Sequence, residues 1–157
     1  MKHTISILVE NHFGVLARVA GLFSARGFNI ESLAVGETED DTISRMTIIV
    51  SGDENILEQV MKQLNKLIDV IKVNEISASS VKRDLLLVKV SSNKNNRKDL
   101  MQLVDIFRAK IIDISSGSMV IEITGDEDKI LAFLELLTPF GIKEVARTGI
   151  IALSRGH

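Results

Sequence analysis

The spacing of apolar residues changes along this chain in a fixed order, and that order restricts the folds open to it. Residues 4–9 carry apolar side chains at every second position, as a strand with one buried face does. A stripe of helical spacing follows, then two strand-like segments, a second helical stripe and a further strand-like segment. The helical stripes consist of Val15, Leu16, Val19, Leu22 and Phe23, and of Ile56, Leu57, Val60, Leu64 and Leu67. The first half of the chain therefore predicts the order βαββαβ.

Turn and cap residues fall between these segments. Gly27 ends the first helical stripe, and the apolar phase of the next strand slips near Glu31 and Ser32, which predicts a bulge. Acidic residues 39–41 are typical of a turn and predict an antiparallel hairpin, and Asp53 is placed to cap the second helix. In the antiparallel sheet of this topology, with both helices on one face, strands one and three are central and strand two is an edge.

The same order of spacings returns in the second half of the chain. Residues 77–83 are small, polar or charged and mostly lack an apolar period, so we expect a linker there. We expect one domain at 1–76 and a second at 84–157. The fold class is then α+β, with two ferredoxin-like βαββαβ domains in tandem.

Composition limits the partners of this protein. The formal net charge is −2, from 19 basic and 21 acidic residues, which gives no attraction toward nucleic acid or anionic membranes. RNA-recognition domains share the βαββαβ order but stack bases on aromatic residues. This chain has no Tyr or Trp and places Thr47, Ile49 and Glu122 at expected exposed sheet positions. Without cysteine, a signal-peptide pattern or a long apolar run, we expect a cytoplasmic protein with no nucleic-acid or membrane partner.

Groups suited to catalysis are scarce. Of three histidines, His3 and His157 are close to the termini, where disorder is common. Around His12 the sequence indicates no two further metal ligands, and no serine or carboxylate has a spacing that designates it as a catalytic partner. No phosphate loop of the Walker or dinucleotide type occurs. We therefore expect no catalytic residue, no metal site and no cofactor in this chain itself.

One loop, residues 11–16, lies where the first strand ends and the first helix begins. The first N–H groups of a helix have no intrahelical acceptor, and with the helix dipole they favour a carboxylate or phosphate. Two interpretations stay open. The loop binds an anionic ligand, or Asn11 only caps the helix while Gly14 only turns the chain. The corresponding loop of the second half, residues 91–97, shares almost nothing with it, so the repeat does not extend to the site.

Asn29 interrupts the apolar start of the second strand, between Phe28 and Ile30. An edge strand with mostly apolar or neutral residues can pair with another copy of the chain. Two copies would then form one continuous sheet, and Asn29 of one chain would face the 11–14 loop of the other. The alternative is that Asn29 only ends the turn after Gly27. The spacing of these residues does not distinguish the two.

A long motif carries a resemblance to one family. Glu10-Asn11-x-x-Gly14-Val15-Leu16, continued to Leu33, closely resembles the N-terminal ACT domain of the acetolactate synthase (acetohydroxyacid synthase) small regulatory subunit. Residues 44–47 and 144–150 resemble the same family, so the resemblance covers essentially the whole chain.

This resemblance implies a non-catalytic partner of a thiamine-diphosphate enzyme that makes the precursors of valine, leucine and isoleucine. Small subunits of the family activate a large catalytic subunit and confer feedback inhibition by a branched-chain amino acid, usually valine, bound between the ACT domains of a homodimer. The implied effector-site residues are Asn11, Gly14, Val15, Leu16, Asn29 and Ile30. Thiamine diphosphate, Mg²⁺ and FAD are expected in the large subunit only. A free-standing ACT protein that senses amino acids and regulates another enzyme or transcription is the alternative.

Overall fold

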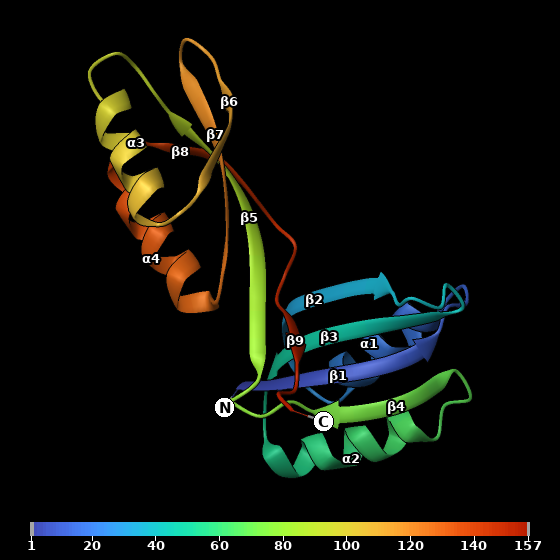
Figure 1. Cartoon of the computed structure of the whole chain (residues 1–157). Coiled ribbons are helices and arrows are strands. Elements are labelled where there is room, and N and C mark those ends of the chain that lie inside the picture. Colours follow the sequence, from blue (N-terminus) through green and yellow to red (C-terminus); the bar gives the residue numbers. More distant parts are fainter. Residues whose placement is uncertain (1, 157) are drawn as a thin grey trace. The chain divides into compact units, whose positions relative to one another are not determined.

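The computed structural model describes residues 2–156, which form two compact units (Figure 1). The first unit runs to Val81 and resumes at Ile150, and the second comprises Lys82–Gly149. Each unit contains the strand and helix order βαββαβ around one antiparallel sheet. The α+β class with two ferredoxin-like units is therefore confirmed. No helix among the described residues is long and apolar enough to cross a membrane.

The first unit has the sheet order β2-β3-β1-β4, so β2 and β4 are its edges, as the sequence predicts for strand two. Its elements in chain order are β1 (Lys2–Glu10), α1 (Val15–Ala25), β2 (Asn29–Glu37), β3 (Ile43–Ser51), α2 (Glu54–Asn65) and β4 (Val70–Glu75).

Local signals in the sequence set the ends of these elements. Gly27 has a φ of +83° just after α1, a conformation that glycine adopts without strain. The pairing of β2 with β3 shifts register between Ile30 and Ser32, which confirms the predicted bulge. The side chain of Asp53 accepts a hydrogen bond from the N–H of Asn55 and caps α2. The core lies between the helices and one face of the sheet and is built largely from the predicted apolar positions.

The second unit has the sheet order β6-β7-β5-β8. Asp126 caps its second helix by accepting from the N–H of Lys129. The carboxylate of Asp84, which is 2% exposed, accepts hydrogen bonds from Arg147 Nε (3.0 Å) and Thr148 Oγ1 (3.2 Å). The elements of this unit are β5 (Val81–Ser91), α3 (Arg97–Ile106), β6 (Lys110–Ile114), β7 (Ser118–Gly125), α4 (Glu127–Leu137), a short 3-10 helix (Thr138–Phe140) and β8 (Ile142–Arg147).

The end of the chain differs from the expected domain division. The sequence suggested one domain over 84–157, but the described residues from Ile150 onward belong to the first unit. Gly149 turns the chain with a φ of +87°, and the N–H of Ile150 donates to Ser32 Oγ at 3.0 Å. The strand β9 (Ile151–Leu153) then lies beside β1. The expected linker 77–83 is also shorter in the structure, because β5 begins at Val81.

A second difference concerns the face of the first sheet that lies away from the helices. Thr47 and Ile49 lie on the sheet face away from the helices and were expected to be exposed, but they are only 2% and 7% exposed. The segment after Gly149 contacts both β1 and β2, so it crosses this face of the first sheet (Figure 1). The face is therefore partly covered rather than open to solvent. Glu122 in the second unit is partly exposed, as expected.

Candidate ligand site at the β1–α1 loop

The loop between β1 and α1 is tied to the β2–β3 turn through Asn11. The backbone N–H of Asn11 donates to Thr42 O at 2.8 Å, and its Nδ2 donates to Asp41 O at 3.0 Å. A weaker contact of 3.5 Å joins Nδ2 to Glu37 Oε1. Of the two interpretations left open for this loop, the one in which Asn11 caps the helix is excluded, because the N-cap of α1 is Gly14 and no side chain caps this helix.

The start of α1 presents unpaired N–H groups. Among residues 2–156, the N–H groups of Gly14, Leu16 and Ala17 have no hydrogen-bond acceptor, whereas that of Val15 donates to His12 O at 3.4 Å. Gly14 has a φ of +86°, which favours glycine there. The first turn contains no acidic side chain. The loop therefore offers donors to an anion at the positive end of a helix dipole.

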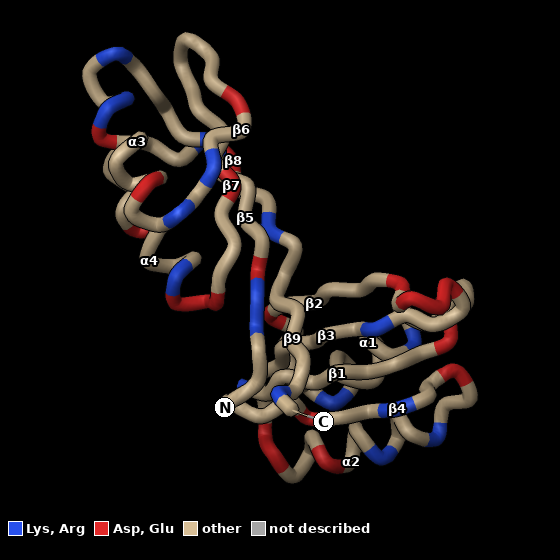
Figure 2. The backbone as a smooth tube through the Cα atoms, viewed as in Figure 1, with Lys and Arg blue, Asp and Glu red and all other residues tan. Residues whose placement is uncertain are grey.

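Acidic residues gather around the same end of the first unit (Figure 2). In the β2–β3 turn, hydrogen bonds from the hydroxyl and then the backbone N–H of Thr42 hold the pKa of Asp40 below its ordinary value. The site thus combines N–H donors with carboxylates, which suits a ligand that carries both charges. The pairing of the strands places six acidic residues at this end: Glu10 and Glu37 at the ends of β1 and β2, Glu39, Asp40 and Asp41 in the β2–β3 turn, and Asp69 just before β4.

The structure does not bring all six predicted effector residues together within one chain. Asn11 and Gly14 lie on the exposed loop and Leu16 is exposed in the first turn of α1, but the side chain of Val15 is buried in the core. Asn29 is exposed at the start of β2, opposite Ser51, and its neighbour Ile30 packs partly against the core. Since β2 ends at Glu37, next to Asn11, the two asparagines lie at opposite ends of a strand that spans about 26 Å.

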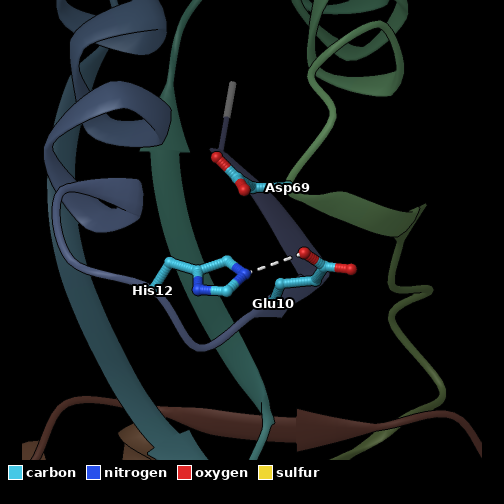
Figure 3. A group of neighbouring side chains, drawn as sticks. All are labelled: Glu10, His12 and Asp69. Carbon is cyan, nitrogen blue, oxygen red and sulfur yellow. Dashed lines mark hydrogen bonds and ion pairs between the residues drawn. The ribbon is translucent and has the colours of Figure 1, made fainter.

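His12 has neighbours that sequence spacing did not reveal. Its Nε2 lies 2.9 Å from Glu10 Oε2, and potential ligand atoms of Glu10, His12 and Asp69 all lie within 4.8 Å of one another (Figure 3). The sequence around His12 did not indicate these two carboxylates as neighbours. Asp69 is distant in sequence and arrives because β4 pairs with β1.

The other two histidines, His3 and His157, were both expected near disordered termini. His3, expected near a disordered terminus, lies in β1, is 3% exposed and has its Nδ1 3.0 Å from Glu75 Oε2. His157 lies outside the described residues.

Family comparisons match both halves of the chain. A model described as "AHAS small subunit-like ACT domain" matches residues 5–72. A model described as "Small subunit of acetolactate synthase" matches residues 83–156.

Individual relatives are similar over nearly the full length. A probable acetolactate synthase small subunit from Archaeoglobus fulgidus is 60% identical over 157 residues, covering 100% of this chain and 99% of the relative. An acetolactate synthase small subunit from Mycobacterium leprae is 56% identical over 155 residues, covering 98% of this chain and 92% of the relative.

A solved structure has the same fold as well as a related sequence. The crystal structure of an acetolactate synthase small subunit from Thermotoga maritima has a TM-score of 0.92 and 44% identity, covering 100% of this chain and 99% of the other. These similarities agree with the motif of residues 10–33 and with the two βαββαβ units. This chain belongs to the family of acetolactate synthase small subunits, and its first unit is an ACT domain.

Proposed function

We propose that this chain activates the large catalytic subunit of an acetolactate synthase and confers feedback inhibition by a branched-chain amino acid, with valine as the first candidate. Membership of the small-subunit family supports a regulatory rather than a catalytic chain and a catalytic partner. In this proposal the large subunit holds thiamine diphosphate, Mg²⁺ and FAD, and this chain contributes no group to the reaction. The observation that carries the effector part is the set of unpaired N–H groups at the start of α1.

An amino acid in its zwitterionic form fits the chemistry of this loop. Its carboxylate would accept from the N–H groups of Gly14, Leu16 and Ala17, where the helix dipole favours negative charge. Its ammonium would bind amide or carboxylate oxygens, for which the side chains of Asn11 and Glu37 are the nearest candidates. A branched side chain would contact the exposed part of Leu16, which is 45% exposed.

A second copy of the chain would complete this site. β2 is an edge strand, and an antiparallel pairing of β2 with its copy would place the start of one strand beside the end of the other. Asn29 of the partner subunit would then lie near Glu37 and Asn11, which one chain alone keeps about 26 Å from its own Asn29. A ligand shared by two subunits binds one interface arrangement better than another. A difference of about 1–3 kcal/mol would regulate activity about 5–150-fold.

The test is reconstitution with the large subunit from the same organism. Acetolactate formation is measured for the large subunit, for this chain alone and for the mixture, and valine, leucine and isoleucine are then titrated into the mixture. We expect no turnover from this chain alone, a rise on mixing and inhibition by at least one of the three amino acids. An unchanged rate on mixing would contradict the partnership.

Calorimetry separates the remaining outcomes. The chain is titrated with each amino acid in the absence of the large subunit, and the titration is repeated with Asn11→Ala. Heat from valine that the substitution removes is the expected result. Binding without any effect on the large subunit would favour the alternative of a free-standing amino-acid sensor, and activation without binding would remove the effector site but keep the partnership.

A further inference from the structure

Glu10, His12 and Asp69 form a side-chain cluster that the proposed regulatory function does not use (Figure 3). They come from the end of β1, the following loop and the turn before β4. One imidazole nitrogen and two carboxylate oxygens lie within 4.8 Å of one another.

Backbone hydrogen bonds hold the three residues in place. The N–H of Glu10 donates to Asp69 O at 2.7 Å, which fixes the end of β1 against the turn before β4. The N–H of His12 donates to Glu10 O at 2.9 Å and closes a tight turn between these two residues. These bonds fix the backbones of the three residues beside one another, so their side chains start from neighbouring positions.

We propose that Glu10, His12 and Asp69 bind a divalent transition-metal ion of the Zn²⁺ class. Zinc bonds to histidine and carboxylate are about 2.0–2.2 Å long, so ligand atoms in a tetrahedral site lie about 3.4 Å apart. The ligand atoms lie within 4.8 Å of one another, so binding would require them to approach by up to about 1.4 Å (4.8 − 3.4), a movement that the exposed side chains of His12 and Glu10 leave room for. The imidazole selects Zn²⁺, Co²⁺ or Ni²⁺ over Mg²⁺ and Ca²⁺, which prefer oxygen ligands only. Three protein ligands leave a further position for water.

One cation competes for this cluster. Arg18 Nη2 lies 3.1 Å from Asp69 Oδ2, but the Arg18 side chain is 57% exposed, so it can turn to solvent at low cost. The other charges at this end of the unit are mostly acidic, including Glu37 and the β2–β3 turn (Figure 2). This surplus of negative charge raises the local concentration of divalent cations.

The bound ion would act on the loop that carries Asn11. Since Asn11 lies between Glu10 and His12 in sequence, an ion held by these two residues and Asp69 would join the loop to the turn before β4. Any effect of this link on effector binding at Asn11 rests on the proposed function, whereas the metal site itself does not.

The experiment titrates Co²⁺ and Zn²⁺ into the full chain with no amino acid present. Co²⁺ binding is followed by its visible absorption, and Zn²⁺ binding by the imidazole resonances of the three histidines. We expect one ion per chain, a Co²⁺ spectrum that Zn²⁺ abolishes and Mg²⁺ in large excess does not, and a shift of the His12 resonances. His12→Gln should weaken binding at least 10-fold, and Asp69→Asn or Glu10→Gln should each weaken it about 10-fold or more.

Glu39→Gln is the matched control. This substitution removes one carboxylate from the same acidic end and leaves the three cluster residues unchanged. The metal affinity of the variant should therefore differ from that of the parent chain by less than threefold. Because His12 is exposed, His12→Gln should fold as the parent does, which circular dichroism checks. Three results would overturn the site. They are metal binding that His12→Gln leaves intact, a loss of affinity in Glu39→Gln equal to that in His12→Gln, and no binding of the metal at millimolar concentration. Failure of this experiment leaves valine binding unaffected, so the two proposals are distinguishable.

Discussion

One glycine lies at each end of α1, and substitutions at the two positions distinguish the effect of backbone strain from the effect on ligand binding. Gly14 and Gly27 have φ values of +86° and +83°, so a side chain at either costs about 1 kcal/mol of stability. Only Gly14 belongs to the proposed effector loop. Gly14→Ala should therefore raise the valine concentration for half-inhibition about tenfold, and Gly14→Asp should raise it further, with activation of the large subunit retained. Gly27→Ala should leave that concentration unchanged, and equal shifts in inhibition curves of both alanine variants would assign the effect to α1 itself.

A second pair of glycines, Gly52 and Gly125, tests how tightly the surrounding side chains pack. Gly52 and Gly125 each precede the aspartate that caps a helix, but their surroundings differ. A Cβ on Gly52 would lie 2.1 Å from the ring of Phe28, which is buried, whereas one on Gly125 would lie 2.5 Å from the flexible side chain of Lys129. Gly52→Ala should destabilise the first unit by about 1–3 kcal/mol, as overpacked cores do. Gly125→Ala should cost clearly less because Lys129 can turn away, and urea unfolding of both variants measures the difference.

At the scale of elements, the edge strand β2 decides whether two copies can share a site. Val35 is 47% exposed on β2, and a lysine on an edge strand disfavours pairing with another strand. Val35→Lys should weaken dimerisation at least tenfold in sedimentation velocity and abolish valine inhibition. Ile71→Lys is the control, because Ile71 is 50% exposed on the opposite edge strand β4. A Val35→Lys chain as dimeric as the parent would exclude β2 pairing and with it the contribution of Asn29 of the partner subunit.

The elements themselves could be predicted from the sequence because local residues determine them. Gly27, Asp53 and Asp126 act on the helix next to them, and the bulge at Glu31 and Ser32 follows from a slip in apolar spacing. The neighbours of a side chain could not be predicted in this way. The pairing of β1 with β4 places Asp69 near His12, and the turn after β2 supplies acceptors to Asn11, although nothing near either residue in sequence indicates this.

At the scale of the whole molecule, the spatial neighbours of the C-terminal segment from Ile150 onward likewise could not be predicted from the sequence. Apolar residues recur over 150–153, where the strand β9 lies, but their spacing carries no information on which unit the strand joins. That choice depends on contacts with residues far away in sequence, such as the hydrogen bond from Ile150 to Ser32. Thr47 and Ile49 lie on the sheet face away from the helices and are nevertheless only 2% and 7% exposed.

The neighbouring residues Ile150 and Ile151 test how much this return of the chain contributes to the first unit. Ile150 is 5% exposed and Ile151 is 57% exposed, so only the first loses buried contacts on truncation. Ile150→Ala should destabilise the first unit by about 2–4 kcal/mol, and Ile151→Ala by less than about 1 kcal/mol. Hydrogen exchange measures the effect by element: amides of β1 and β3 should exchange faster in Ile150→Ala. Amides in the core of β7 should keep their protection, because β7 belongs wholly to the second unit. Equal acceleration in β3 and β7 would instead show that the two units unfold together, and the C-terminal segment would then stabilise the chain as one cooperative body.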